Sequence, residues 1–161
     1  MPAKICFFLV VLISLGACKR VWYEVEPVHY ASDTSRFFVP VLPHHFNGYH
    51  HNIYPDGAIH SEGNYNNGVP SGYWKYYYTN GNMLMEGNYN NQMLSGYWKF
   101  YYENGRLREE GNYNNNQRSG YWKFYYENGK PSGEGNYHND QKNGEWKYYH
   151  SDGSLREVVR Y

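Results

Sequence analysis

Cysteine is nearly absent from this 161-residue chain, which contains only Cys6 and Cys18. Both lie within the first 18 residues, so the rest of the chain has no thiol for a disulfide or a cysteine-ligated metal site. An excess of one charge is also lacking, because 15 Lys and Arg residues balance 15 Asp and Glu residues. With neither net positive charge nor a basic patch, the composition does not favour nucleic acid as a partner.

Long apolar runs are missing except at the N-terminus, where residues 5–15 follow the basic Lys4. This run is shorter than the roughly 20 residues of a membrane-spanning helix, and small residues follow it. We therefore expect a signal peptide over residues 1–17. The sequence LGAC at residues 15–18 resembles the bacterial lipobox, in which cleavage leaves the cysteine as a lipid-modified N-terminus. This resemblance implies lipidation at Cys18 and a bacterial lipoprotein in the cell envelope, at the outer membrane or facing the periplasm. An ordinary signal peptide with an incidental cysteine is the alternative.

Helix-forming residues in a helical period are also missing. The chain is rich instead in 21 Tyr, 17 Gly and 5 Trp residues. Tyrosine and tryptophan favour strands, whereas glycine and asparagine favour turns. The composition therefore predicts an all-β protein.

A 24-residue unit occurs four times over residues 62–157, with degenerate copies on either side. Each unit opens with Glu-Gly-Asn-Tyr and continues to Gly-Tyr-Trp-Lys, which is varied to Gly-Glu-Trp-Lys in the fourth. It then ends with aromatic residues and Asn-Gly or Asp-Gly. Repeats of this kind stack to bury a shared face, and atypical end units act as caps. We predict a lipidated N-terminus and tether over residues 18–46 and a repeat domain over residues 47–161.

Asn-Gly and Asp-Gly between strand-like residues predict β-hairpins with type I′ turns, in which both central residues have positive φ. A two-residue loop at 104–105 predicts these pairs: Lys99 with Glu110, Trp98 with Gly111, and Tyr102 with Leu107. The neighbouring hairpins give the same Lys–Glu and Trp–Gly pairs, and the end hairpins pair His51 with Glu62 and Lys147 with Val158. The predicted fold is an elongated, single-layer, twisted antiparallel sheet of stacked β-hairpin repeats, with roughly nine or ten strands.

Strand alternation separates two faces of this sheet. One face is aromatic and carries Tyr102 and Leu107. Its predicted structural residues, in which glycine leaves room for the opposite indole, are Trp74, Trp98, Trp122, Trp146, Gly87, Gly111 and Gly135. A ligand-stacking strip is the alternative role for these tryptophans. The other face is predicted to carry Arg108. The tyrosines on this face offer a large contact area and lose little conformational entropy on binding. The candidate binding residues on it are Tyr97, Lys99, Tyr101, Tyr121, Lys123 and Tyr125. Solubilising the sheet is the alternative role for this face.

Motifs for catalysis, cofactors and metals are missing as well. The sequence has no phosphate-binding loop, no dinucleotide-binding glycine motif and no nucleophile elbow around its serines. The histidine pairs at 44–45 and 50–51 would give one ligand each to a common site, because neighbours on a strand point to opposite faces. We therefore predict no enzyme activity, no cofactor and no bound metal.

The unit E-G-N-Y-x-N-x(4)-G-Y-W-K-x-Y-Y-x-N-G resembles the MORN repeat, in the variant common in bacterial YwqK-like antitoxins, and residues 48–161 carry it. The resemblance implies a hairpin array for protein or membrane association. With the predicted lipid anchor, the sequence predicts a non-enzymatic, extracytoplasmic binding or scaffold module whose partner is an envelope protein. The alternatives are an antitoxin or immunity protein that neutralises a toxin, and a cell-wall glycan binder that uses exposed tyrosines. Self-association through an uncovered apolar face is a further alternative.

Overall fold

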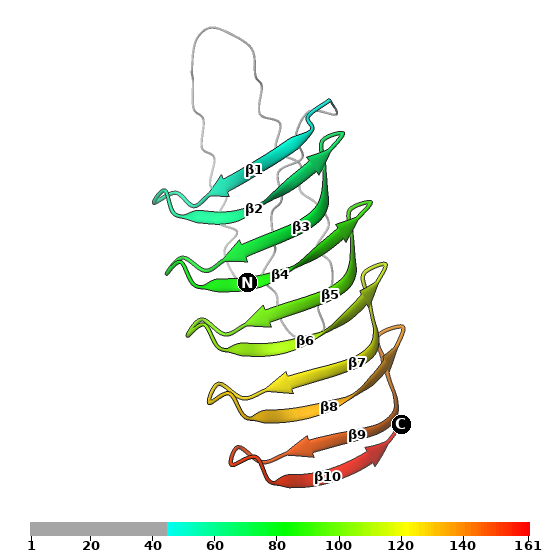
Figure 1. Ribbon diagram of the computed structural model, residues 1–161. Helices are drawn as coiled ribbons and strands as arrows, with labels where there is room; N and C mark the ends of the chain where they lie inside the picture. The colour runs from blue at the N-terminus through cyan, green and yellow to red at the C-terminus, as the bar shows by residue number, and fades with distance from the viewer. Residues whose placement is uncertain (1–44) are drawn as a thin grey trace, which may run out of the picture.

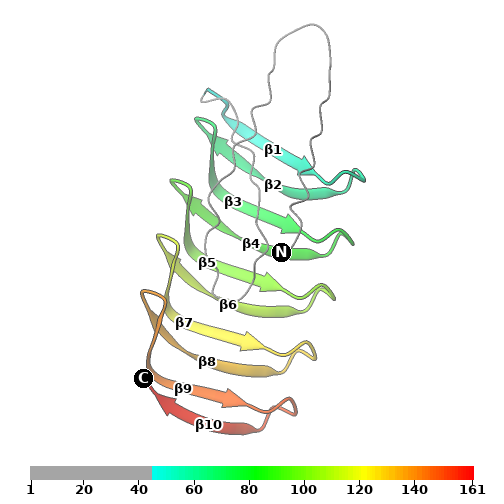
Figure 2. The same ribbon diagram turned by 180° about the vertical axis from the view of Figure 1, so that it is seen from behind.

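A computed structural model describes residues 45–161 as one sheet of ten antiparallel strands in chain order (Figure 1). The strands are β1 (Gly48–Ile53), β2 (Ile59–Asn66), β3 (Val69–Tyr77), β4 (Met83–Asn90), β5 (Met93–Tyr101), β6 (Leu107–Asn114), β7 (Gln117–Tyr125), β8 (Pro131–His138), β9 (Gln141–Tyr149) and β10 (Leu155–Arg160). Strands β1 and β10 are the edges of the described sheet, and successive hairpins keep nearly the same direction (Figures 1 and 2). The predicted all-β sheet of stacked hairpins is confirmed.

The predicted signal peptide, Cys18 and the tether up to residue 44 lie outside the described residues. Within residues 45–161, no helix is long and apolar enough to span a membrane.

The predicted register is confirmed at the positions that define the repeat. Lys99 pairs with Glu110 and Trp98 with Gly111, and the equivalent pairs recur in the hairpins on either side. At the ends of the sheet, His51 pairs with Glu62 and Lys147 with Val158, also as predicted. Each inner Lys also pairs with the Glu of the preceding strand, as Lys99 does with Glu86. Lysine and glutamate therefore alternate in one continuous row across the sheet.

The predicted type I′ turn at the Asn-Gly loops is wrong. In the loop between β5 and β6, only Gly105 of the two residues has positive φ, at 82°. The Gly105 N–H donates to the Tyr102 carbonyl at 2.9 Å, and the Tyr102 N–H donates to the Arg106 carbonyl at 2.8 Å. This is a three-residue loop, a type I turn followed by a left-handed glycine. A bulge between Phe100 and Tyr101 then compensates for the extra loop residue, so the inner pairs keep their register.

Because of the same bulge, three further predictions at this end of the hairpin are wrong: the pairing of Leu107, its face and the face of Arg108. Leu107 pairs with Tyr101 rather than with Tyr102, so it is not on the aromatic face. The Arg108 guanidinium lies 5.9 Å from the ring centroid of Phe100, on the face assigned to the tryptophans rather than on the opposite one. An extra residue on one strand shifts the alternation by one position, which exchanges the faces of its neighbours.

Type I′ turns occur instead at the opposite ends of the strands, in the loops β2–β3, β4–β5, β6–β7 and β8–β9. Both central residues of these four loops have positive φ: Asn67-Gly68, Asn91-Gln92, Asn115-Asn116 and Asn139-Asp140. Asparagine and aspartate tolerate this conformation better than most residues. These turns allow β3, β5, β7 and β9 to begin directly after the preceding strand.

A glycine bulge bends each of these odd-numbered strands. Residues 72–73 are two extra residues on β3, because Gly63 pairs with Trp74 while the next residue of β2 pairs with Ser71. Gly72 has a φ of 71°, which glycine adopts without the steric cost of a Cβ atom. Figure 1 shows the odd-numbered strands bending near their starts. The bend brings Tyr65 over the indole of Trp74, edge to face with ring centroids 5.0 Å apart.

The tryptophans form the centre of the buried layer, and Trp74, Trp98 and Trp122 are 0% exposed. Each indole lies on the glycine of the preceding strand, as Trp98 does on Gly87, rather than on the glycine of its own predicted hairpin. Its Nε1 donates to the carbonyl of the residue after that glycine, at 3.1 Å from Trp98 to Asn88. Each of these glycines therefore leaves room for an indole, as predicted. The indole, however, belongs to the tryptophan eleven residues later in the chain.

Candidate functional site

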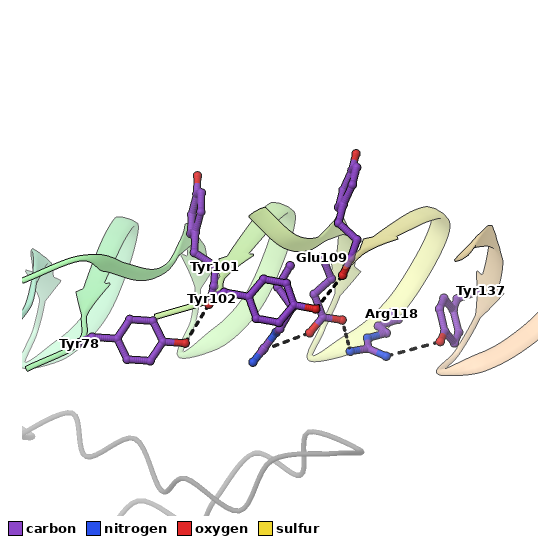
Figure 3. A network of polar contacts seen from close by, with 8 residues as sticks. Tyr78, Tyr101, Tyr102, Glu109, Arg118 and Tyr137 are labelled. Carbon is purple, nitrogen blue, oxygen red and sulfur yellow. Dashed lines mark hydrogen bonds and ion pairs between the residues drawn. The ribbon is translucent and has the colours of Figure 1, made fainter. Parts of the chain in front are cut away.

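The structure brings all six predicted binding residues onto the face opposite the tryptophans. We call this surface the ladder face. It comprises the alternating Lys–Glu row, in which His51 takes the first lysine position. It also comprises the tyrosines found two residues before or after these lysines or His51, and the asparagines two residues after each glutamate. For the repeat at β5, these are Tyr97, Lys99 and Tyr101, with Glu110 and Asn112 on β6. Figure 3 shows Tyr101 pointing to the side opposite Glu109 and Arg118.

Each glutamate of the ladder face accepts hydrogen bonds from two tyrosine hydroxyls. Glu86 Oε2 accepts from Tyr73 at 2.5 Å, and Oε1 accepts from Tyr101 at 2.6 Å. The same arrangement, which we call the Tyr–Glu–Tyr clamp, recurs around Glu62 with Tyr49 and Tyr77, Glu110 with Tyr97 and Tyr125, and Glu134 with Tyr121 and Tyr149. The clamps link neighbouring hairpins, because the two tyrosines of each clamp belong to different repeats.

The clamps of Glu62, Glu86 and Glu134 keep these carboxylates ionised, because the pKa of each is lowered. For Glu86, burial raises the pKa, but the hydrogen bonds from Tyr101 and Tyr73 and the charges of Lys99 and Lys75 outweigh it and leave the pKa below its ordinary value. For Glu62, the hydrogen bond from Tyr49 is the largest cause of the same lowering of the pKa. A carboxylate with a lowered pKa and both oxygens occupied is a poor general base.

The first tyrosine of each clamp is half exposed and stands in a row that crosses the strands. The exposed fraction is 59% for Tyr49, 47% for Tyr73, 47% for Tyr97 and 46% for Tyr121. Directly opposite each on the next strand lies an exposed asparagine, such as Asn112 opposite Tyr97. Because equivalent strands are two strand spacings apart, the members of the row recur about every 9.5 Å. The ladder face is thus a regular array of tyrosine–asparagine pairs.

We expect this network to destabilise the fold at both ends of the pH range. Burial and the bond to glutamate raise the pKa of Tyr73, Tyr97 and Tyr121 from 10.0 to about 12. A raised pKa stabilises the folded state below the ordinary value, and this stability is lost as pH rises from 10 towards 12. The lowered pKa values of Glu62 and Glu86 act at the acidic end, where stability is lost as pH falls below 4.5.

The urea midpoint measured against pH checks this expectation, alongside ultraviolet titration of tyrosinate. The double variant Tyr97→Phe/Tyr121→Phe is the matched control, because it keeps both rings and removes two of the delayed ionisations. Its urea midpoint should fall less steeply between pH 10 and 12. Ionisation of every tyrosine near pH 10 in the folded protein would contradict the clamps.

The aromatic face contains a polar cluster that the sequence did not predict. Glu109, 6% exposed, receives Arg118 Nη2 at 2.7 Å and Arg108 Nη2 at 3.3 Å (Figure 3). The Arg118 guanidinium also lies 4.7 Å from the ring centroid of Trp122. A hollow of about 220 Å³ adjoins the cluster, lined by Tyr102, Phe124 and Ser132 among others. At the equivalent positions one repeat earlier, the chain has Met85 and Leu94, both buried.

The histidines of the described region do not gather into a metal site. His50 and His51 stack with ring centroids 6.1 Å apart, and His60 is half-buried against Tyr54. Burial lowers the pKa of His60. Among residues 45–161, no three His, Cys, Asp or Glu side chains are grouped closely enough to hold a metal ion.

Comparison with known proteins identifies the family of this chain. No curated protein matches this chain. The MORN repeat variant matches it at four places, residues 70–91, 94–115, 118–139 and 142–161. Each match covers one hairpin closed by Asn-Gly or Asp-Gly, from β3–β4 to β9–β10. Because these matches cover more than half of the sequence, this chain belongs to the MORN repeat variant family.

Proposed function

We propose that this chain is a non-enzymatic binding module of the bacterial cell envelope, tethered by lipid at Cys18 and holding its partner on the ladder face. MORN repeats are commonly modules that bind proteins or membranes. The observation that carries the proposal is the row of half-exposed tyrosines, each fixed by a bond to a glutamate. Rings that are already fixed lose little conformational entropy when a partner binds.

The chemistry of the ladder face supports binding rather than a reaction. Tyrosine hydroxyls occupy the carboxylate oxygens of its glutamates, and the pKa values of Glu62, Glu86 and Glu134 are lowered, so these side chains are poorly placed to donate a proton or to activate a nucleophile. Lysines such as Lys99 and Lys123 pair with glutamates on the neighbouring strands. A polar surface with fixed aromatic rings has the composition of a binding site.

The sequence prediction of an envelope protein as partner is part of this proposal, together with its two alternatives. A YwqK-like antitoxin or immunity protein would have to meet its toxin outside the cytoplasm if Cys18 is lipidated. A glycan would use the exposed tyrosines. The ladder face is the proposed contact surface in each case.

The tether is tested by replacing Cys18 with alanine in an epitope-tagged full-length protein. We expect the wild-type protein in the membrane fraction and the Cys18→Ala variant released from it, because the lipid supplies the membrane attachment. Fractionation and mass measurement of the N-terminal peptide check both points. If both forms are found in the cytoplasm, the tether is wrong and a cytoplasmic antitoxin becomes the better hypothesis.

The contact surface is tested with a photocrosslinking phenylalanine analogue at Tyr97 or Tyr121, in cells that produce the tagged protein. We expect a reproducible crosslink from both positions, because they are exposed on the ladder face. Glu127 is the matched control, since it is exposed in the loop after β7. Crosslinks from Glu127 but from neither tyrosine would assign the contact to another surface.

A further inference from the structure

The ladder face and the aromatic face differ in how regularly their residues recur from repeat to repeat. Along the ladder face, Tyr, Lys, Glu and Asn recur at equivalent positions with few exceptions. On the aromatic face, the positions of Glu109 and Arg118 vary in every copy, with Ser61, Met85 and Gly133 at the first and Pro70, Leu94 and Lys142 at the second. A single globular partner has no translational repeat and is matched best by varied contacts. A surface that repeats itself is matched best by a ligand that repeats itself at the same interval.

The orientation of the exposed tyrosines defines what such a ligand must offer. Tyr73 lies opposite Asn88, and its hydroxyl reaches Glu86, two residues along the neighbouring strand. The ring is therefore tethered at its hydroxyl end, and 47% of the residue is exposed to solvent. The face of an aromatic ring carries partial negative charge and attracts C–H groups with partial positive charge. Sugar rings with equatorial substituents present such C–H groups on their flat faces.

The asparagines supply the polar part of the same unit. Asn88, Asn112 and Asn136 are exposed and pair directly with Tyr73, Tyr97 and Tyr121. An amide side chain offers two donors and an acceptor, which suits the hydroxyl groups and the N-acetyl groups of sugars. Each repeat therefore combines a flat aromatic surface with adaptable hydrogen bonding, which together recognise a carbohydrate.

The spacing of the row selects the linkage. Neighbouring sugars of a β-1,4-linked chain are turned over relative to one another, so the repeating unit of the extended polymer is a disaccharide. The length of that disaccharide is close to two strand spacings, about 9.5 Å. Successive hairpins keep nearly the same direction (Figure 2), so the row runs straight enough for an extended chain. Four tyrosines from Tyr49 to Tyr121 would contact a continuous run of sugars.

We propose that the ladder face binds an extended β-1,4-linked polysaccharide that runs across the strands with one disaccharide per repeat, an inference that rests on the proposed function. Tyr49, Tyr73, Tyr97 and Tyr121 stack against the sugars, and the asparagines opposite them hydrogen-bond the substituents. Each single contact is weak, and linked contacts raise the affinity through their effective concentration. One disaccharide per repeat matches the recurrence of the same surface residues along the sheet.

The test is calorimetric titration of the purified full-length protein, in detergent, with β-1,4-linked oligosaccharides of increasing length. One series is built from N-acetylglucosamine and the other from glucose, which distinguishes a wall-type glycan from an unmodified glucan. We expect the affinity for the hexasaccharide to exceed that for the disaccharide by roughly tenfold or more, because three repeats act together. An affinity that does not change with length in either series would overturn the proposal.

Variants separate recognition from folding. Tyr97→Ser/Tyr121→Ser removes two rings and should reduce hexasaccharide affinity about tenfold, whereas Tyr97→Phe/Tyr121→Phe keeps the rings and should retain most of it. Tyr126→Ser is the control for losing a tyrosine outside the row. If the double serine variant fails to fold, Asn112→Ala/Asn136→Ala removes only exposed amides and should lower the affinity severalfold. Unchanged affinity in the folded ring-deleted or amide-deleted variant would contradict the proposal.

The photocrosslinking result distinguishes failure of this inference from failure of the proposed function. If no oligosaccharide binds but Tyr97 and Tyr121 crosslink one protein, the partner is a protein and the polysaccharide is wrong. If no oligosaccharide binds and neither tyrosine crosslinks anything, the ladder face is not a binding surface and both proposals are wrong.

Discussion

Replacing Gly135 with alanine is expected to lower the free energy of unfolding by about 3 kcal/mol, because an indole occupies the space that the new methyl group needs. A methyl group at Gly135 would lie 2.4 Å from Cδ2 of Trp146. That atom belongs to a rigid, fully buried ring whose Nε1 donates to the Asn136 carbonyl at 2.9 Å. The ring can move only by losing this hydrogen bond and its contacts with Tyr137, so overpacking and a lost hydrogen bond add together.

Gly133→Ala is the matched control for this effect. Gly133 lies on the same strand and the same face, two residues earlier, and is also buried. A methyl group there would lie 3.3 Å from Cδ1 of Tyr148, a ring edge that can move by a few tenths of an ångström. The expected change is within about 1 kcal/mol. Urea unfolding of the two variants measures the difference, and Gly111→Ala beneath Trp122 is expected to repeat the larger loss in the centre of the sheet.

Equal stability of Gly135→Ala and Gly133→Ala would show that the indoles do not depend on the glycines beneath them. In that case the repeated Glu-Gly pair would have another cause. A large loss for Gly135→Ala alone assigns the glycine of each repeat to close packing rather than to turn formation.

The register of the sheet could be predicted from the sequence although the turn could not. The assumed two-residue loop at 104–105 is one residue too short, and the bulge near Phe100 restores the pairing of Lys99 with Glu110. The longer loop and the bulge cancel each other. The predicted pairs beyond the bulge, such as Lys99 with Glu110, are therefore right, whereas the pair of Tyr102 with Leu107 beside the loop is wrong. Only the residues between the loop and the bulge, such as Leu107 and Arg108, have their faces exchanged.

The Tyr–Glu–Tyr clamp was within reach of the sequence. On the predicted register, Tyr97 opposes Asn112, so Glu110 is its diagonal neighbour on the same face, within reach of a long aromatic side chain. The opposite charges of lysine and glutamate predicted the Lys–Glu pair as the partner of the carboxylate instead. The fixed hydroxyls of the tyrosines, rather than the lysines, occupy the carboxylate oxygens.

Only one half of the cluster of Glu109 and Arg118 lacks a clear sequence signal. Glu109 pairs with Phe100 in the predicted register as in the structure, and strand alternation places it on the same face as Gly111. Arg118 lies on a strand only because the turn at 115–116 forms without glycine. A charged residue directly after this asparagine-rich loop looks like a surface residue until the turn is known.

Replacing Glu109 with methionine is expected to cost about 3 kcal/mol of folding free energy, because it leaves the guanidinium of Arg118 buried without its carboxylate. The Arg118 side chain is 14% exposed and Glu109 Oε2 is 2.7 Å from its Nη2. Arg118 keeps the hydroxyl of Tyr137 at 3.4 Å, the hydroxyl of Tyr113 and several aromatic rings, which replace only part of the lost interaction.

The double variant Glu109→Met/Arg118→Leu is expected to recover the wild-type stability or exceed it. It copies Met85 and Leu94, the buried residues at the same two positions of the preceding repeat, which are 1% and 0% exposed. The surrounding rings are also nearly the same, since Phe100 and Phe124 occupy equivalent places. A buried ion pair replaced by apolar residues of similar volume is often neutral or stabilising, whereas breaking it from one side is costly.

A double-mutant cycle by urea unfolding, with Glu109→Met, Arg118→Leu and the double variant, measures the coupling between the two residues. We expect a coupling of about 6 kcal/mol, because each single change strands the other charge at about 3 kcal/mol whereas the double variant loses no stability. Additive losses, with the double variant the least stable, would mean that the two residues do not act as a pair. Recovery in the double variant would instead mean that the ion pair and the apolar pair are interchangeable solutions for the same buried site, so that the charges are not needed for the fold. Their retention beside the hollow would then call for a reason other than stability, and the varied aromatic face would become a second surface to examine for ligands.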